Sequence, residues 1–310
     1  MAIAWLCASV GAPVTIAQHG AHLHASGYCI LPQPVISAES VSTARRLCHT
    51  TLQRLLHEAE AAGCDPIEQM YIFDKVCHRQ RNRWDLLIDA DSEPAWQGLI
   101  TAAIEAATPI IREAQGDAFS GLVPLMSGAV VSRPGARVQR FHCDATHSHF
   151  EAARLDPSHR IYNIFVPLVD IEEDGDGTMF WPVPCLEEST RALAKHILDS
   201  PDSCLDPNAI DAPSTAAGGL IIFDYRTIHR GLANPDETGR ERPVAYVAVA
   251  SGGAFDGYNF PKASMRDVSR EQLQRLPFWN QGKAACDSLD YYTEIEGADE
   301  FAVLREDGDA

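Results

Sequence analysis

Basic residues are few in this sequence. Among its 310 residues, lysine and arginine number 25 whereas aspartate and glutamate number 43, so the formal net charge is −18. An acidic surface repels phosphate backbones and anionic lipids. We therefore expect neither a nucleic-acid partner nor a membrane partner.

Cysteine pairs and long apolar runs are also missing. The nine cysteines are scattered and form no C-x-x-C pair, which fits neither a zinc ribbon nor a disulfide framework. No apolar run approaches the ~20 residues of a membrane-spanning helix. The apolar segment 1–18 lacks the basic region of a signal peptide, because the first basic residue is Arg45. These features predict a reduced, cytoplasmic protein and leave open whether it is a monomer or a homodimer.

Helical patterns dominate the first third of the chain. Residues 37–63 have apolar positions at three- and four-residue steps, with serines in front and a glycine behind, which predicts an amphipathic helix. Residues 92–116 form a second such stretch, which Pro109 is expected to kink or split. Shorter helices are predicted at 186–200 and 269–276. The apolar positions of the first helix are Val41, Ala44, Cys48, Leu52, Leu55 and Ala59.

The middle of the chain consists of β-branched and aromatic runs separated by glycine, proline and acidic turns, such as "RIYNIFVPLVDI" and "GGLIIFDYRTIHRG". Helices followed by many short strands favour a β-sandwich or open barrel buttressed by the N-terminal helices. There is no repeat and no linker, so we expect one domain over residues 1–310. Its expected parts are a helical part (about 1–120), a β core (about 121–255) and a C-terminal extension (256–310).

The segment "RFHCDATHSHF", residues 140–150, contains three histidines and an aspartate. Residues two apart in a strand project to the same face, so His142 and Asp144 are expected to point together. A non-haem Fe(II) site needs two histidines and one carboxylate, and His229, at the end of another apolar strand, is the best second histidine. His147 and His149 lie beyond the predicted strand, and we interpret them as loop residues without a metal role.

Two arginines, Arg240 and Arg242, follow His229 where the next strand is predicted to begin. An arginine at this place can bind the distal carboxylate of a dicarboxylic acid through paired hydrogen bonds, while the other end of the acid chelates iron. An H-x-D pair alone is a weak signal. The ordered set of H-x-D, a histidine at a strand end and an arginine at the next strand is far stronger.

These motifs resemble the phytanoyl-CoA dioxygenase superfamily of Fe(II)- and 2-oxoglutarate-dependent oxygenases. The resemblance runs from about residue 26 to residue 250. It is carried by "SGYCILPQPVIS", "RPGARVQRFHCD", "NIFVPLVDIEEDGDGT" and "HRGLANPDETGRERPVAY".

The resemblance implies a mainly β protein with flanking α-helices, in which a double-stranded β-helix (jelly-roll or cupin-like) core is buttressed by N-terminal helices. It implies Fe(II) bound by His142, Asp144 and His229, with 2-oxoglutarate and O₂ as cosubstrates. Two arginines are candidates for the residue that binds 2-oxoglutarate. The usual number of residues after the second histidine ligand, His229, indicates Arg240. The usual place directly before the residues that open the next strand indicates Arg242, which we favour. The other expected polar neighbours of 2-oxoglutarate are Gln139, Asn163 and Thr178.

The implied reaction is hydroxylation, desaturation or ring closure at an unactivated C–H bond, with release of succinate and CO₂. Halogenating relatives have a small residue where Asp144 stands, so halogenation is disfavoured. The sequence "WPVPCLEES" departs from the family pattern, so the family does not give the substrate. The N-terminal helices and the segment 186–200 could form a lid over a small pocket, which favours a small molecule as the substrate. Two alternatives stay open: an oxygenase acting on a prolyl or lysyl side chain, and a cupin-like binding protein without catalysis.

Other candidate residues receive plainer interpretations. The tract "QHGAHLHA", with His19, His22 and His24, precedes a predicted strand and is interpreted as surface histidines. Trp181 is assigned to core packing, whereas Arg133 fits a place near the cosubstrate and a surface position equally well. For the three predicted iron ligands, the alternative is a buried polar network without chemistry.

Overall fold

The structure is a computed structural model that describes residues 14–65, 72–145, 147–172, 177–181, 212–235 and 239–256. The helices predicted at 186–200 and 269–276 lie outside the described residues. None of the described helices is both long and apolar enough to cross a membrane. The described helices are α1 (Ile16–Ser26), α2 (Ala38–Ala61), α3 (Pro94–Gln115), α4 (His147–Leu155) and a 3-10 turn, η1 (Gly116–Ala118).

The helix α2 confirms the sequence pattern. It begins after Ser37, whose hydroxyl accepts a hydrogen bond from the backbone N–H of Ser40. All the apolar positions predicted from its spacing are buried, and they pack in the main hydrophobic core. The helix therefore owes its stability chiefly to one apolar face.

The helix α3 confirms the second predicted helix, but it is not split at Pro109. A proline in a helix interior removes one backbone donor and costs about 3 kcal/mol. Ile110 and Ile111 come directly after it and are buried in the main core, so tertiary packing holds the helix through the proline. The predicted split is therefore wrong, and the other predicted effect of Pro109, a kink, stays a prediction.

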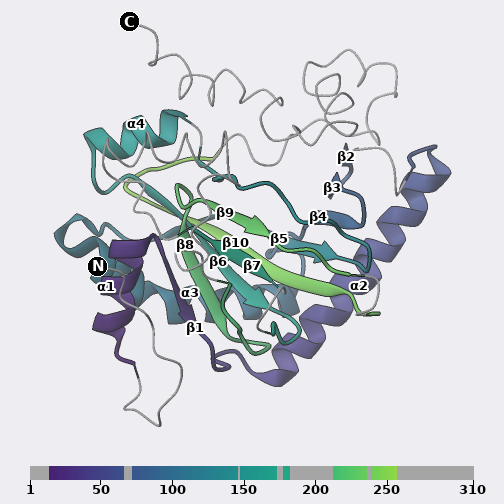
Figure 1. Ribbon diagram of the computed structural model, residues 1–310, viewed down its shortest axis with the longest axis horizontal. Coiled ribbons are helices and arrows are strands. Elements are labelled where there is room, and N and C mark those ends of the chain that lie inside the picture. Colours follow the sequence, from purple (N-terminus) through teal and green to yellow (C-terminus); the bar gives the residue numbers. More distant parts are fainter. Residues whose placement is uncertain are drawn as a thin grey trace, which may run out of the picture.

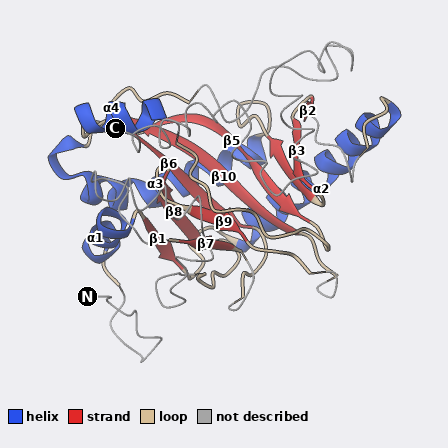
Figure 2. Ribbon diagram, turned by 45° about the horizontal axis from the view of Figure 1, so that its top comes forward, coloured by secondary structure: helices blue, strands red, loops and turns tan. Residues whose placement is uncertain are grey.

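Eight antiparallel strands form a large sheet in the order β1-β8-β6-β10-β5-β4-β3-β2, and two further strands, β7 and β9, pair as a small sheet. Figure 1 shows this arrangement, and Figure 2 shows α2 and α3 behind the large sheet. The predicted jelly-roll core with N-terminal helices against it is confirmed. The strands are β1 (Tyr28–Leu31), β2 (Ile72–Phe73), β3 (Val76–Gln80), β4 (Arg83–Leu87), β5 (Val123–Ser132), β6 (Arg160–Pro167), β7 (Thr178–Phe180), β8 (Leu220–Asp224), β9 (His229–Gly231) and β10 (Arg242–Ser251).

The two faces of the large sheet differ in character, because successive residues of a strand point to opposite sides. One face packs against the helices and includes Trp84, Ile164 and Val247 in the main hydrophobic core. The neighbours of these residues, among them Asp85 and Asn163, point to the other face. This second face is polar in part, and it carries the candidate site.

Two local predictions need correction, and one helix was not predicted. That helix is α1, which contains the tract with His19, His22 and His24, begins with a capping box formed by Thr15 and Gln18, and precedes the strand β1 as expected. His147 and His149 lie in the helix α4, not in a loop. His142 forms an isolated bridge with His229 and is not part of a regular strand.

The segment that contains β2, β3 and β4 was not predicted to be in strands. Its charged residues Arg79, Arg83 and Asp85 obscure the apolar alternation that indicates a strand. Arg83 and Asp85 are buried on the face of the sheet that points away from the helices, which we call the inner face. The expected division of the chain into three parts stays a prediction.

Candidate metal centre

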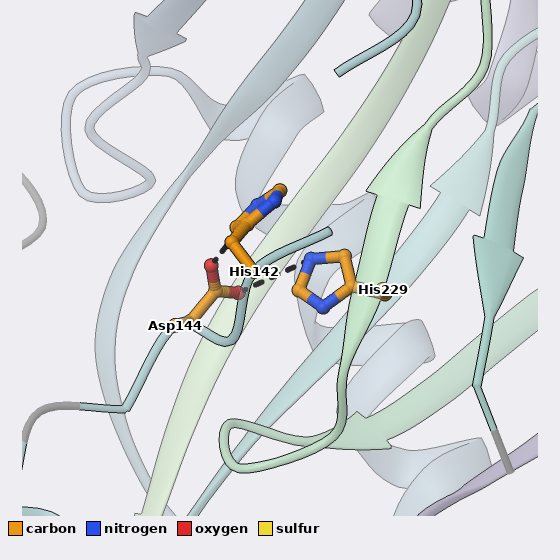
Figure 3. Close-up of side chains that lie close together, drawn as sticks. All are labelled: His142, Asp144 and His229. Atoms are coloured by element: carbon orange, nitrogen blue, oxygen red, sulfur yellow. Dashed lines mark ion pairs between the residues drawn. The ribbon is translucent and has the colours of Figure 1, made fainter. Parts of the chain in front are cut away.

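Three predicted ligands come together on the inner side of the large sheet. One possible ligand atom from each of His142, Asp144 and His229 lies within 4.8 Å of the other two. Nε2 of His142 is 3.9 Å from Oδ1 of Asp144, and Nε2 of His229 is 3.8 Å from Oδ2. Figure 3 shows both rings turned toward the carboxylate.

Backbone hydrogen bonds hold this group in place. The N–H groups of His142 and His229 each donate to the carbonyl oxygen of the other residue, at 2.9 and 2.8 Å. The N–H groups of Asp144 and Ala145 both donate to the carbonyl oxygen of Tyr225, at 2.9 and 3.0 Å. The positions of the three side chains therefore depend on a bridge between two segments that are far apart in the sequence.

The second ring nitrogen of each histidine has a carbonyl partner two residues earlier in the chain. Nδ1 of His142 lies 2.9 Å from the carbonyl oxygen of Arg140, and Nδ1 of His229 lies 2.9 Å from that of Thr227. A carbonyl only accepts, so each Nδ1 carries the proton and donates it. This tautomer leaves the lone pair on Nε2, the nitrogen that faces Asp144, as in histidines that bind metals.

The carboxylate of Asp144 is oriented by an amide. Nδ2 of Asn163, a buried residue of β6, donates to Oδ2 of Asp144 at 2.7 Å. The expected place of Asn163 beside 2-oxoglutarate stays a prediction, and the structure adds this contact with the carboxylate. A hydrogen bond of this kind fixes the direction of a ligating carboxylate.

The group is largely withdrawn from water, with His229 buried and with His142 and Asp144 half-buried. Burial, followed by the neighbouring His229, lowers the pKa of His142 to about 3, so its imidazole is neutral at pH 7. Burial raises the pKa of the Asp144 carboxyl, because charge is costly away from water. A divalent cation would offset this cost, since it attracts a carboxylate and binds neutral imidazole.

Two buried arginines converge beside His229. Nη2 of Arg242 donates to the carbonyl oxygen of Leu232 at 2.7 Å, and its Nη1 donates to that of Ala233 at 3.0 Å. Nη2 of Arg83 donates to the same carbonyl of Leu232 at 2.7 Å and to that of Arg137 at 3.0 Å. Two guanidinium groups therefore share one acceptor, and their combined charge creates a place for an anion.

The predicted polar neighbours Gln139 and Thr178 lie at the same place. Oε1 of Gln139 accepts from the N–H of Gly231 at 2.9 Å, and Thr178 is paired with Gly231 across the small sheet. A side chain on Gly231 would collide with Gln139 and with the guanidinium of Arg83. A glycine at this position therefore leaves room beside the arginine.

Of the two candidate anchors, Arg242 is the buried one. Its side chain is 3% exposed at the start of β10, whereas Arg240 precedes the strand and is partly exposed. Sequence analysis missed Arg83, which is 2% exposed and lies in register with Ser132 and Arg242 across three strands. Because the strand β4 was not predicted, the sequence held no signal that would have identified Arg83 as a site residue.

A further polar network missed by sequence analysis lies on the inner face of the sheet. Nη2 of Arg79 is 2.6 Å from Oδ2 of Asp85, and the hydroxyl of Tyr246 donates to Oδ1 at 2.9 Å. Arg79 lies close enough to lower the pKa values of both His142 and Asp144, although burial has the larger effect on each. This network therefore lies close to His142, Asp144 and His229, which we call the metal-type group.

The other residues singled out in the sequence have partners outside the three-residue group. Nε2 of His149 is 2.8 Å from the carbonyl oxygen of Phe255. Trp181 is buried edge-on against Phe141, as core packing predicts. Nε of Arg133, a half-buried residue, donates to Glu241 at 2.6 Å, and the two readings of Arg133 both stay predictions.

The fold and the three converging side chains define a jelly-roll protein with a candidate metal site of the two-histidine, one-carboxylate type. No family model matches the sequence, and no curated protein matches it. Among solved structures the chain is similar to AviO1 from Streptomyces viridochromogenes Tue57, with a TM-score of 0.51, 14% identity, and coverage of 79% of this chain and 99% of that one.

Two further solved structures share the fold. HygX from Streptomyces hygroscopicus, whose structure contains nickel and 2-oxoglutarate, has a TM-score of 0.50 and 13% identity, with 80% of this chain and 91% of that one covered. EvdMO1 has a TM-score of 0.52 and 14% identity, and the match covers 77% of this chain but 50% of EvdMO1. At these identities the similarity establishes the fold.

Proposed function

We propose that this protein is an Fe(II)- and 2-oxoglutarate-dependent dioxygenase. The observation that carries the proposal is the convergence of His142, Asp144 and His229, with both Nε2 atoms and the carboxylate turned to one point. Two neutral imidazoles and one carboxylate on one side of a cation form the donor set of non-haem Fe(II) oxygenases. The three residues therefore fit the metal that the sequence resemblance implies.

The pair of buried arginines, Arg83 and Arg242, supports 2-oxoglutarate as the cosubstrate. Arg242 and Arg83 would bind its distal carboxylate, with Gln139 and Thr178 beside them, while its other end reaches the metal. Both arginines lie around Leu232, only three residues after the ligand His229. The structure of HygX, which has this fold, contains nickel and 2-oxoglutarate together and supports the same pairing here.

When bound, Fe(II) and 2-oxoglutarate supply oxidising power from O₂ and release succinate and CO₂. The protein's own residues have other tasks: Asn163 orients Asp144, two carbonyl groups fix the histidine tautomers, and the arginines hold the cosubstrate. Asp144 occupies the position that halogenating relatives leave open. The proposed reaction is therefore hydroxylation, desaturation or ring closure at an unactivated C–H bond.

The proposed substrate is a small molecule. Arg79, Asp85 and Tyr246 form a polar surface on the inner face of the sheet, near the metal-type group. Polar groups on an enclosed surface orient a small substrate and contribute to its specificity. A cytoplasmic location is part of the proposal, because the nine cysteines have no pairing pattern.

The test is an anaerobic titration of 2-oxoglutarate into the Fe(II)-loaded full chain, followed through the weak visible charge-transfer absorption of the chelate. We expect a band in the unaltered protein, no band in His142→Ala, and a much higher half-saturating concentration in Arg242→Met. The matched control is His57→Ala, which removes an exposed histidine of α2 and should leave the band unchanged.

Two results would contradict the proposal. The first is no band together with no binding of 2-oxoglutarate by calorimetry. The second is a band that survives in His142→Ala at the strength of the His57→Ala control, because the metal would then lie elsewhere.

A further inference from the structure

A hollow with several charged and polar side chains in its lining lies on the opposite face of the large sheet from the metal-type group. Its volume is about 120 Å³, and it is bounded by α1, the end of α3 and the turn between β8 and β9. Two of its lining residues, His24 and Pro157, are exposed, so the hollow opens to solvent. Its lining residues include Gln115, Arg160, Tyr162, Asp224, Arg226 and Thr227.

Neighbouring residues of the same strands face this hollow and the metal-type group, because successive side chains point to opposite sides of a sheet. Tyr162 and Asp224 are cross-strand partners that line the hollow, whereas the adjacent pair, Asn163 and Phe223, points to the metal side. Asn163 is the residue whose amide holds Asp144. The hollow and the metal-type group are therefore distinct sites on two faces of one sheet.

The hollow has more positive than negative charge. Arg226 donates from Nε and Nη2 to the two carboxylate oxygens of Asp224, at 2.7 and 2.5 Å. Arg160 brings a second guanidinium, with its Nε 3.9 Å from Oδ2 of the same carboxylate. One carboxylate thus faces two arginines, and the nearby Asp156 is exposed and bound to Ser158.

The environment of Arg160 confirms that the two cations oppose each other. Burial lowers the pKa of Arg160, and the charge of Arg226 lowers it further, while Asp224 acts in the opposite direction. A bound anion would relieve this repulsion, because a negative charge near two partly buried guanidinium groups is strongly favoured.

One buried donor at the hollow has no acceptor within the described part of the chain. Nε2 of Gln115 is buried and lacks one there, although Oε1 of the same side chain accepts from the Ser251 hydroxyl at 3.1 Å. Arg160, which lines the same hollow, donates from Nη1 to the carbonyl groups of Ala153 and His159. A buried donor without a partner requires an acceptor, which an oxyanion supplies.

We propose that the hollow lined by Arg160, Arg226 and Gln115 is a binding site for a small oxyanion, a carboxylate or a phosphate. Two guanidinium groups and an amide are the donors that such oxygens accept from. The volume of about 120 Å³ lies well below that of sites for drug-sized ligands, so the occupant has few heavy atoms.

An occupant of this site would also touch a segment that positions a metal-type ligand. Thr227 lines the hollow, and its carbonyl oxygen accepts the hydrogen bond from Nδ1 of His229. The turn Asp224 to Thr227 is thus the wall between the two sites. The proposal itself concerns binding at the hollow and does not depend on the proposed oxygenase activity.

Calorimetry on the metal-free full chain tests the proposal, with inorganic phosphate and acetate titrated separately in a low-salt buffer. We expect one equivalent of at least one anion to bind, and Arg160→Gln to lower its affinity by at least about tenfold. Arg160→Lys keeps the charge and should retain part of the affinity. Binding of phosphate alone, acetate alone or both supports the site and identifies the oxyanion.

Two control variants locate the binding. Arg54→Gln removes an exposed arginine of α2 and should leave the affinity unchanged. Arg242→Gln alters the proposed cosubstrate site and should leave unchanged the binding that Arg160→Gln weakens. If Arg160→Gln does not fold, Gln115→Ala takes its place and should also weaken binding.

The proposal is overturned if neither anion binds, or if the affinity in Arg160→Gln, or in Gln115→Ala where that variant takes its place, equals that of Arg54→Gln. It is also overturned if Arg242→Gln abolishes binding, because the anion would then lie beside Leu232 on the metal side. Unfolding curves of every variant, measured first, ensure that only folded proteins are compared.

Discussion

Arg83 and Arg242 donate hydrogen bonds to one carbonyl oxygen, that of Leu232, each at 2.7 Å. They come from β4 and β10, strands that are separated in the sheet by β5. These like charges lie close together in positions only 2% and 3% exposed, and a carboxylate bound by both would reduce their mutual repulsion. We therefore expect both arginines to bind the distal carboxylate of 2-oxoglutarate.

The first prediction concerns Arg83. Arg83→Met should raise the half-saturating concentration of 2-oxoglutarate by about 10–100-fold, the range for losing a hydrogen bond to a charged group. Leu232 keeps the donor from Arg242, so its carbonyl is not left without a partner. The measurement is the anaerobic absorption titration, with Arg54→Met as a control. A shift below twofold in a folded Arg83→Met would assign Arg83 a purely structural role.

The second prediction concerns the amide that holds Asp144. Asn163→Ala removes the 2.7 Å hydrogen bond to Oδ2, and the loss of such a support typically weakens metal binding by about 10–100-fold. Competition with a chromophoric chelator measures the affinity for Fe(II) or a stand-in divalent ion. Gln97→Ala, which removes an exposed amide of α3, should change nothing. Equal metal affinities in the two variants would contradict this role.

The metal-type group could be predicted from sequence because its signal is local. H-x-D places a histidine and a carboxylate two residues apart, and His229 follows an apolar run whose residues are all buried in β8. The expected regular strand at His142 was wrong, yet the bridge to His229 keeps an extended backbone there. Because His142 and Asp144 are two residues apart along this extended backbone, their side chains still point to the same side.

The pair of buried arginines could be predicted only in part, because the place of one of them, Arg83, depends on tertiary contacts. Arg242 stands at a strand start that the sequence indicates, but Arg83 lies in a segment whose inward charges hide its strand character. Asp85 is stabilised there by Arg79 and Tyr246, which no pattern along the chain brings together. The helix α1 was missed for a related reason, since its tract of histidines has no clear apolar stripe.

The third prediction concerns the stability of the turn at Gly27. This glycine ends α1 with φ of 79°, and a side chain on it would collide with Thr227, whose hydroxyl donates to the Gly27 carbonyl at 2.8 Å. Gly27→Ala should lower the free energy of unfolding by about 1–3 kcal/mol. Urea denaturation measures it.

A glycine of ordinary helical geometry gives the matched control for Gly27. Gly98 lies in α3 with no atom near the position of a new side chain, so Gly98→Ala should stabilise the protein by about 0.5–1 kcal/mol. If both variants change stability in the same direction, the strain assigned to Gly27 is absent.

The fourth prediction concerns the pH dependence of stability. Glu241, which precedes Arg242, accepts hydrogen bonds from His49 of α2 and from Arg133, at 2.9 and 2.6 Å. Burial alone would raise the pKa of Glu241, but these two partners outweigh it and hold the pKa below its ordinary value of 4.5. The unfolded chain therefore takes up the proton first as the pH falls.

The contribution of Glu241 is thus complete at pH 7 and is lost as the pH falls below 4.5 and through the lower pKa of the folded state. Glu241→Gln should reduce the free energy of unfolding by about 1 kcal/mol at pH 7, because the group is only partly exposed. The two proteins should converge in acid. Urea denaturation across this pH range measures the difference, and Glu58→Gln, which breaks the exposed pair with Arg54, should show almost none. A difference between Glu241→Gln and the unaltered protein that stays constant into acid would mean that the carboxylate contributes by packing and not by charge.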